Sequence, residues 1–297
     1  MSLLWVTGSS GTIGRAIHKR FSIKPILRSS AANVQNVEHR PCWDPQTGQF
    51  WDTNEAVGAV LNLSGAPIAA ERWSSQRKKV LWDSRILATR HLVDWMLQRP
   101  QRPNVLISAS AVGYYGDGGS QVKKEQDSVG NGFLASLAQA WEQEALRAAE
   151  GGIRVVLLRM GSVLSLEGGV LKRLLPIYRK GGGGPVAGGA QYFPWIHIDD
   201  LVSVVLWAAN SSDISGAFNV VAPQMVPQKE FAQALGRSLR RPANIPAPAI
   251  AIKLTMGEMG KELVLQGQRV SSARLVESGF EFKHPTLQQA FNHLLSK

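Results

Sequence analysis

The chain has 297 residues, of which 44% are hydrophobic and 19% are charged, and its formal net charge is +11. This length allows one large domain or two smaller ones around a substantial core, and the composition excludes a disordered chain. No apolar run approaches the roughly 20 residues that span a bilayer, and the first apolar segment becomes glycine-rich too soon for a signal peptide. A single cysteine, Cys42, excludes an internal disulfide and a multi-cysteine metal site, so we expect a cytoplasmic protein.

The positive charge is concentrated in residues 72–79 (RWSSQRKK) and 236–241 (GRSLRR). Neither segment has the interleaved aromatic and glycine residues of a surface that binds single strands, and the chain has no zinc-finger or RNA-recognition signature. We interpret both segments as solvated faces, which argues against a nucleic-acid partner. A positive field also favours an anionic cofactor or substrate.

Strand-like and helix-like segments alternate as far as residue 222. In chain order, apolar and periodic patterns predict a strand at 3–8, a helix at 11–21, strands at 24–28 and 58–65, a helix at 74–98, a strand running into a loop at 104–116, a helix at 131–152 and a strand at 153–164. Residues 168–210 predict a helix, a glycine loop, a short strand and a helix that begins at the Asp199–Asp200 pair, and 216–223 predict a last strand. All-apolar strands between helices indicate a parallel sheet covered on both faces. From residue 223 onward, short helices separated by prolines indicate a smaller lobe.

Three glycines, Gly8, Gly11 and Gly14, lie between the first predicted strand and the first predicted helix. In a dinucleotide-binding loop the first glycine permits a tight turn, the second lets the backbone approach the pyrophosphate, and the third lets helix and strand pack closely. The spacing G-x-x-G-x-x-G differs from the usual dehydrogenase pattern G-x-G-x-x-G, and glycines also serve ordinary turns. We favour dinucleotide binding because the strand, the loop, the helix and a second strand occur in the expected order.

The end of the second predicted strand discriminates between the two nicotinamide coenzymes. An acidic residue there would bind the ribose hydroxyls of NAD, whereas this chain has Arg28, Ser29 and Ser30. A guanidinium suits the 2′-phosphate of NADP. We therefore predict NADP as the cofactor, the alternative being a surface arginine without a ligand.

Longer motifs cover most of the rest of the chain. They are WDPQTG (43–48), LNLSGAPI (61–68), RW (72–73) followed by DSRI (83–86), SASAVGYYG (108–116), GGPVAGGAQYFPWIHIDDL (183–201), FAQALGRSLRRPANIPAP (231–248), LVLQGQRV (263–270) and ESGFEFKHPTLQQA (277–290). With these motifs the sequence resembles the extended and atypical short-chain dehydrogenase/reductases, and within them the "epimerase family protein" group. This group is nucleoside-diphosphate-sugar-epimerase-like and is described in some bacteria as a cell-division-inhibitor homologue.

The resemblance implies an α/β fold, a Rossmann-type doubly wound parallel sheet that binds NADP(H) over residues 1–222. It also implies a smaller, mainly helical C-terminal lobe over 223–297, with 165–195 contributing to the substrate cleft. It assigns the pyrophosphate to Gly8, Ser9, Gly11, Thr12, Ile13 and Gly14. It assigns the 2′-phosphate end to Arg28 and Ser29, and the adenosine side to Leu63 and Ser64. Arg85 is a further cofactor candidate, although an exposed helical arginine explains it nearly as well.

The catalytic residues of this superfamily are incomplete in the chain. Its reductases and epimerases use a Ser or Thr, a Tyr that transfers a proton, and a Lys in Y-x-x-x-K that lowers the pKa of that tyrosine. Alignment through Glu142 places Leu134 and Ala138 where the Tyr and Lys are expected. Ala111 takes the usual serine position, and Ser110 lies one residue upstream.

Two functions remain open. In the first, an NADP(H)-dependent oxidoreductase or nucleotide-sugar-epimerase-like enzyme acts on an unidentified small molecule, with nucleotide-linked compounds among the candidates. Ser110 and Tyr115 are then the catalytic candidates, and Ser108, Tyr114 and His197 are further possibilities. In the second, the chain binds NADP(H) without hydride transfer, as a regulatory or interaction protein.

Several residues admit a structural interpretation as well. Tyr115 before a glycine can pack in a turn, and His197 can be a core histidine. Asp199 and Asp200 suit the first turn of a helix. The glycines of 179–189 are compatible with a loop that approaches a substrate phosphate and with a flexible connection.

Overall fold

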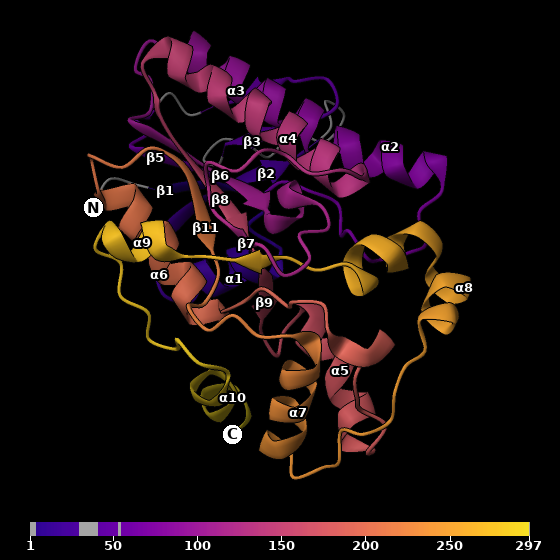
Figure 1. Cartoon of the computed structure of the whole chain (residues 1–297). Coiled ribbons are helices and arrows are strands. Elements are labelled where there is room, and N and C mark those ends of the chain that lie inside the picture. The colour runs from indigo at the N-terminus through magenta and orange to yellow at the C-terminus, as the bar shows by residue number, and fades with distance from the viewer. Residues whose placement is uncertain (1–3, 30–40, 53–54, 297) are drawn as a thin grey trace. The chain divides into compact units, whose positions relative to one another are not determined.

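The computed structural model describes residues 4–29, 41–52 and 55–296 (Figure 1). Contacts group the chain into two compact units, each built from separate segments. Unit 1 comprises Met1–Ser110, Leu137–Leu158 and Val205–Ala217, and unit 2 comprises Ala111–Ser136, Arg159–Val204 and Phe218–Lys297. The units differ from the predicted division at residue 222, because two internal segments cluster with the C-terminal residues.

An eight-stranded sheet has the strand order β11-β8-β6-β5-β1-β2-β3-β4. Its strands are β1 (Leu4–Thr7), β2 (Ile23–Arg28), β3 (Cys42–Trp43), β4 (Phe50–Trp51), β5 (Ala59–Asn62), β6 (Val105–Ala111), β8 (Arg154–Met160) and β11 (Gly216–Val220). The pairs β1–β2, β1–β5, β5–β6 and β2–β3 are parallel, and β3–β4 is antiparallel. The order reverses between β1 and β5, as in Rossmann dinucleotide-binding folds, which confirms the predicted fold class.

Unit 1 contains β1 to β5, most of β6 and β8 and the start of β11, together with the helices α1 (Thr12–His18), α2 (Ser75–Asp83), α3 (Ile86–Gln98) and most of α4 (Phe133–Leu146). Helices α3 and α4 lie side by side over one face of the sheet (Figure 1). Leu92 and Met96 of α3 and Ala145 of α4 join the strand residues Trp5 and Leu106 in one buried cluster. This burial of apolar surface from both layers stabilises the fold.

Two predicted elements are interrupted in the structure. The helix expected at 74–98 is two helices, α2 and α3, separated by a turn at Ser84 and Arg85, where Arg85 has φ −113° and is the N-cap residue of α3. The strand expected at 153–164 ends at Met160, and Ser162–Leu164 form β9, which pairs with β10 (Trp195–His197) in a separate two-stranded sheet. Gly161 lies at this break because a Cβ there would stand 2.8 Å from the carbonyl oxygen of Pro194.

The short strands β3 and β4 form a hairpin that the sequence patterns did not predict. Its turn is the WDPQTG motif, in which the Asp44 carboxylate accepts from the Gln46 amide and Gly48 has φ +77°. Phe50 of this hairpin stacks on Trp95 of α3 at 4.6 Å between ring centroids. The motif therefore closes one edge of the sheet.

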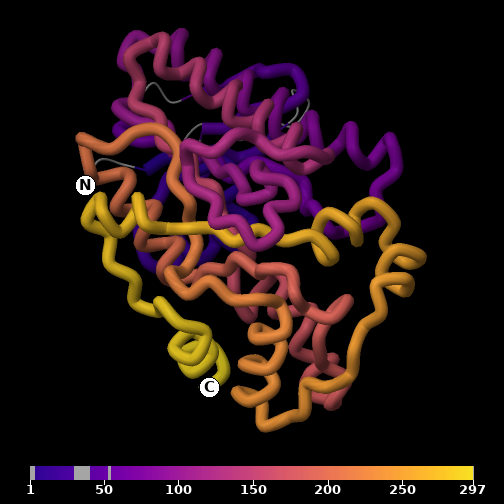
Figure 2. The backbone as a smooth tube through the Cα atoms, in the orientation of Figure 1, coloured from indigo at the N-terminus to yellow at the C-terminus, as the bar shows by residue number. Residues whose placement is uncertain are grey.

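Unit 2 carries the predicted mainly helical C-terminal region. Its regular elements, apart from β9 and β10, are β7 (Val122–Lys123), α5 (Gly169–Arg179), the first part of α6 (Ile198–Asn210), α7 (Gln228–Ser238), α8 (Ala249–Gly260), β12 (Arg269–Val270), α9 (Ala273–Glu277) and α10 (Leu287–Leu295). Helices α7 and α10 pack together (Figure 2). The ring centroids of Phe231 and Phe291 lie 5.6 Å apart between them. Within the described ranges, no helix combines the length and the apolar character needed to cross a membrane.

Short helical turns complete the chain: η2 (Val112–Tyr115), η3 (Arg147–Gly151), η4 (Ala187–Gly189) and the π-helical η5 (Lys261–Leu265). In the glycine-rich tract of unit 2, a Cβ at Gly183 would meet the Tyr178 ring at 2.5 Å and one at Gly184 would meet the Ile245 carbonyl oxygen at 2.1 Å. Close packing therefore explains these two glycines without a ligand.

Candidate functional site

The loops that follow β1 and β5 meet where the strand order reverses. A Cβ on Gly8, which has φ +68°, would stand 2.6 Å from the carbonyl oxygen of Leu63. Thr7 donates its hydroxyl hydrogen to the Asn62 side-chain oxygen at 2.9 Å, which ties the two strand ends together. In open α/β sheets this is the place where ligands bind, outside the carboxyl ends of the strands.

The backbone path requires glycine at two of the three loop positions, Gly8 and Gly14. Gly11 is the N-cap of α1, and its amide donates to the Gly8 carbonyl at 3.0 Å. A Cβ at Gly14 would stand 2.5 Å from the Cα and the carbonyl oxygen of Ser9. The close approach at Gly14 is therefore to the loop itself rather than to the strand that the pattern predicted. No side chain caps α1, so the loop and the helix start present backbone groups, as a pyrophosphate site needs.

Arg28 ends β2 and is exposed. The Ser29 amide donates to the Trp43 carbonyl at 2.9 Å, and the Ser29 side chain hydrogen bonds to the Cys42 thiol. Burial raises the pKa of that thiol. Ser30 lies outside the described residues. The β2 end is thus held by β3 and leaves a guanidinium in solvent, which is compatible with the predicted 2′-phosphate contact.

A buried polar network lies under the same strand ends. The Asn62 side-chain amide donates to the Thr89 hydroxyl at 2.8 Å and to the Ser108 hydroxyl at 3.5 Å. The Trp141 indole donates to the same Thr89 oxygen at 2.9 Å. Buried polar groups that are mutually bonded hold a single geometry, because any rearrangement leaves one of them unpaired. The network therefore fixes the ends of β5 and β6 to α3 and α4. Ser108, a further catalytic possibility, is one of its members.

Leu63 and Ser64 continue from β5 with their backbones fixed. The Leu63 amide donates to the Thr7 hydroxyl at 3.2 Å, and the Ser64 amide donates to the Asn62 side chain at 3.2 Å. The Arg85 guanidinium supports the next residues: it donates to the Ala66 carbonyl at 3.0 Å and lies against Gly65.

Arg85 is half-buried at the start of α3. It also donates to the Leu81 carbonyl at 3.2 Å and stacks over the Trp141 ring at 5.3 Å. Burial, and then the charge of Arg77, lower the pKa of Arg85 to about 10. The structure thus places this arginine behind the loop after β5, where it holds the loop. The interpretation as an exposed helical arginine is wrong, and direct contact with a cofactor stays a prediction.

Ser110 is bonded to a buried acid on α4. Its hydroxyl donates to a Glu142 carboxylate oxygen at 2.6 Å, and the two residues are buried. The sequence patterns assigned no role to Glu142. Its spacing of four residues from Ala138, and of eight from Leu134, puts it on the helix face of the two missing catalytic residues. That spacing is the sequence signal that could have singled it out.

Tyr115 belongs to unit 2 and is 2% exposed. Its hydroxyl donates to the Asn219 side-chain oxygen at 2.6 Å and accepts from the Arg159 guanidinium at 2.9 Å. The same guanidinium lies over the Tyr114 ring at 3.6 Å from its centroid. Burial outweighs Arg159 and raises the pKa of Tyr115 to about 12. This environment opposes a role in proton transfer at neutral pH and favours the packing interpretation.

Replacing Tyr115 with phenylalanine should weaken folding without changing turnover. Loss of the hydroxyl leaves buried Asn219 and Arg159 groups without this partner, at a cost of about 1–3 kcal/mol. Because the folded-state pKa lies above the unfolded value of 10.0, the hydroxyl stabilises the fold fully below pH 10 and progressively less as the pH rises towards 12. Urea unfolding of both proteins at pH 8 and 11 measures the difference, which should shrink by about 1.4 kcal/mol at the higher pH. A large fall in kcat instead would restore Tyr115 as a catalytic group.

His197 and the two aspartates lie where β10 ends and α6 begins, in unit 2. His197 is fully buried, and its Nδ1 accepts from the Asp199 amide at 2.9 Å. Asp199 and Asp200 lie in the first turn of α6, as predicted. The Asp200 carboxylate is buried and accepts from the Lys283 and His284 amides, so it also holds the C-terminal segment. Nearby, Trp195 is buried and the Phe193 ring packs on the Phe231 ring.

Two family models match the chain. The model described as the NAD dependent epimerase/dehydratase family matches residues 4–221, and a domain of unknown function matches residues 247–294. An epimerase family protein of Mycobacterium leprae is 37% identical over 298 residues, covering 98% of this chain and 95% of its own length. The chloroplastic epimerase family protein SDR39U1 homolog of Arabidopsis thaliana is 37% identical over 303 residues, covering 98% and 86%.

Among solved structures, the human epimerase family protein SDR39U1, crystallised with NADPH, superposes with a TM-score of 0.89 at 29% identity and covers 99% of both chains. A UDP-N-acetylglucosamine 4-epimerase of Methanobrevibacter ruminantium superposes with a TM-score of 0.71 at 16% identity, covering 99% of this chain and 98% of its own, which is a likeness of fold alone.

Proposed function

Because the chain belongs to the NAD dependent epimerase/dehydratase family, we propose that it is an NADP(H)-dependent oxidoreductase or epimerase-like enzyme acting on a small molecule. One observation carries this proposal: the glycine loop after β1 meets the loop after β5 at the reversal of strand order, within unit 1. The human relative crystallised with NADPH supports the choice of cofactor. The substrate class is open, and a nucleotide-linked compound is one candidate, which the chain's positive charge would favour.

The residues present fit a dinucleotide. Gly8 and Gly14 let the loop pack closely against Leu63 and Ser9, and the uncapped start of α1 at Gly11 leaves backbone groups for a pyrophosphate. The adjacent Ser9, Thr12 and Ile13 would supply further backbone groups. Leu63 and Ser64 take the adenosine side, and Arg28 with Ser29 takes the 2′-phosphate. When bound, NADP(H) would supply or accept the hydride.

Ser110 and Glu142 are the groups that we propose for proton movement. β6 is separated from β1 by β5 alone, so the carboxyl end that carries Ser110 belongs to the same sheet edge as the glycine loop. The Ser110 oxygen takes a proton from a substrate hydroxyl while its own proton passes to the Glu142 carboxylate, over the 2.6 Å bond already present. In the reducing direction both protons move back. This relay would replace the missing Tyr and Lys.

Following NADPH absorbance against a panel of aldehydes, ketones and nucleotide sugars tests the enzyme proposal. An enzyme should oxidise NADPH with at least one class or, as an epimerase, convert a nucleotide sugar without net loss of NADPH. Product analysis by mass spectrometry and NMR detects the second case. Saturable NADPH binding with no product from any class would favour the other function below.

Replacing Arg28 with alanine should remove the preference for NADPH over NADH. A guanidinium–phosphate hydrogen bond is worth about 1.5–3 kcal/mol, so NADPH affinity should fall about 10- to 100-fold while NADH affinity changes little. Calorimetric titration with both coenzymes measures this, and Arg72→Ala, an exposed arginine of the same unit, is the control. Equal affinities for NADPH and NADH in the parent protein would contradict the assignment.

A second function, NADP(H) binding without catalysis, is favoured by two observations. Leu134 and Ala138 replace the Tyr and Lys, and Tyr115 is buried with its hydroxyl bonded on both sides. In that case Ser110 and Glu142 form a structural bond between β6 and α4. Their substitution would then change stability alone.

A further inference from the structure

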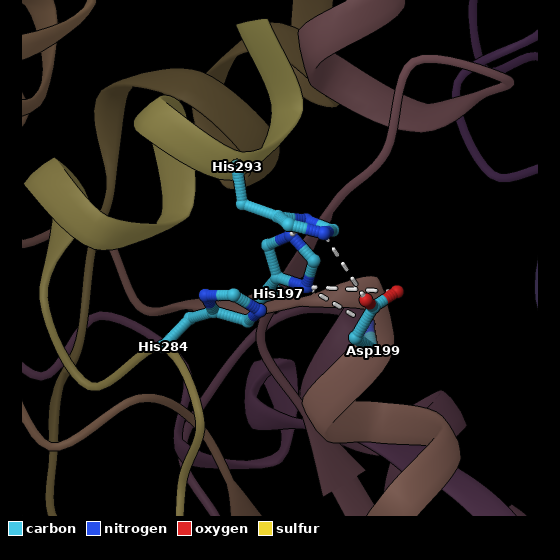
Figure 3. A group of neighbouring side chains, drawn as sticks. All are labelled: His197, Asp199, His284 and His293. Carbon is cyan, nitrogen blue, oxygen red and sulfur yellow. Dashed lines mark hydrogen bonds and ion pairs between the residues drawn. The ribbon is translucent and has the colours of Figure 1, made fainter. Parts of the chain in front are cut away.

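Four side chains of unit 2 gather at one point: His197, Asp199, His284 and His293 (Figure 3). We call them the histidine cluster. They come from the end of β10, the first turn of α6, the segment before α10, and α10 itself. Each offers a nitrogen or oxygen atom, and these atoms all lie within 4.8 Å of one another. The cluster contains none of the residues assigned above to NADP(H).

The hydrogen bonds of the cluster indicate which ring nitrogen of His197 and of His293 carries the proton. Because His197 Nδ1 accepts from the Asp199 amide, the proton of the neutral ring is on Nε2. That nitrogen lies 3.2 Å from His293 Nδ1, to which it donates. The proton of His293 is then on its Nε2, which faces an Asp199 carboxylate oxygen at 3.9 Å. The lone pair of His197 Nδ1 is directed at the Asp199 amide, and Asp199 Oδ1 lies 3.9 Å from the same nitrogen.

Imidazole nitrogens together with a carboxylate are the donor set of borderline transition-metal ions such as zinc. We propose that His197 Nδ1, a nitrogen of His284 and the Asp199 carboxylate bind one divalent transition-metal ion of the zinc class, and that His293 orients His197 from outside the coordination sphere. Three protein ligands leave a fourth position for water.

The donor atoms lie within 4.8 Å of one another and must move closer together to bind such an ion. Bonds of about 2.1 Å at tetrahedral angles place ligand atoms about 3.4 Å apart. The 3.9 Å between His197 Nδ1 and Asp199 Oδ1 must therefore close by about 0.5 Å. The Asp199 side chain is 14% exposed and the His293 side chain is 46% exposed, so solvent reaches this side of the cluster.

Metal binding keeps the hydrogen bond between His197 and His293 and displaces the one from the Asp199 amide to His197. His197 retains the proton on Nε2 and its bond to His293, and a metal-ligating histidine commonly donates its other N–H in this way. The bond from the Asp199 amide to Nδ1 is lost, and one such bond shifts an equilibrium by about tenfold. Burial lowers the pKa of His284, which keeps its ring in the neutral form that metals bind.

An ion at this place would join the β10–α6 corner to the segment before α10. Asp200 already holds that segment through the Lys283 and His284 amides. A ligand that binds the folded state alone stabilises it, so the ion should raise the thermal midpoint in a concentration-dependent way.

Calorimetric titration of the chelator-stripped, full-length protein with Zn²⁺ tests the proposal. We expect one ion per chain, and cobalt(II) in its place should give the visible absorption of a four-coordinate site. Asp199→Asn and His284→Ala should each weaken binding by about 100-fold or more, since a lost ligand costs more than a lost outer partner. His293→Gln should weaken binding by about 10- to 100-fold and keep the stoichiometry.

His18→Ala, which removes an exposed histidine of unit 1, is the control and should bind as the parent does. Circular dichroism of each metal-free variant checks folding. If His284→Ala does not fold, the near-isosteric Asp199→Asn variant tests the metal site instead. Failure of the stripped parent to bind Zn²⁺ stoichiometrically would overturn the proposal. Unchanged affinity in Asp199→Asn would overturn it as well. Because these readouts need no coenzyme, they are independent of the proposed function.

Discussion

Replacing Glu142 with glutamine is expected to lower kcat by about 10²- to 10⁴-fold, the usual contribution of a positioned proton-transfer group. Glutamine keeps the length of the side chain and can accept the hydrogen bond from Ser110, but its amide cannot take up the proton. Ser110→Ala should reduce kcat to a similar extent, and the double variant should lose little more, because the two groups act as one relay. Steady-state kinetics with the substrate found in the panel measures these effects.

Glu144→Gln is the matched control, because Glu144 lies on the same helix and pairs with Arg90 and Arg147. It should leave kcat within about twofold of the parent, as a partly exposed ion pair contributes little. NADPH affinity should be the same in all of these variants. Normal kcat in a folded Glu142→Gln protein would remove Ser110 and Glu142 from the chemistry.

Replacing Gly14 with alanine should weaken NADPH binding by about 10- to 100-fold. The new Cβ would stand 2.5 Å from the Ser9 Cα and carbonyl oxygen, which are backbone atoms, so the loop must shift. Such overpacking costs about 1–3 kcal/mol, whereas the better helix propensity of alanine returns at most about 1 kcal/mol. The overpacking cost exceeds the gain in helix propensity, so the net effect of the substitution on the loop is unfavourable. Calorimetric titration with NADPH reports the affinity.

Gly182→Ala provides the comparison for this substitution. Its Cβ would meet the Ile177 side chain at 3.3 Å, which a small side-chain movement relieves. This variant should bind NADPH as the parent does. Parent-like NADPH affinity in Gly14→Ala would show that the glycine loop does not hold the coenzyme.

Much of unit 1 could be predicted from local patterns. The apolar strand β1, the glycines and the short helix α1 follow one another in sequence, and the structure confirms each. The break between α2 and α3 could not be predicted, because no glycine or proline marks it. It arises where Arg85 turns to bond the Leu81 and Ala66 carbonyls, the second of which belongs to a distant loop. The two-residue strands β3 and β4 are too short to show a period.

In the candidate site, too, local patterns predicted some residues, whereas the roles of others depend on distant parts of the chain. The glycine loop was predicted because the positive φ of Gly8 and the close packing at Gly14 impose a residue type that is visible in the sequence. The roles of Glu142 and Tyr115 depend on residues far away in the chain, Ser110 in one case and Arg159 and Asn219 in the other. The histidine cluster likewise unites residues that are separated by up to 96 positions. No local pattern carries such pairings.

We expect unit 1 to hold NADP(H) in the loop after β1. Titrating the purified protein with NADPH, and following energy transfer from its tryptophans to the bound nicotinamide, tests it most directly. We expect saturable binding of one NADPH per chain, with NADH bound more weakly. An absence of saturable NADPH binding by the folded protein would contradict the account.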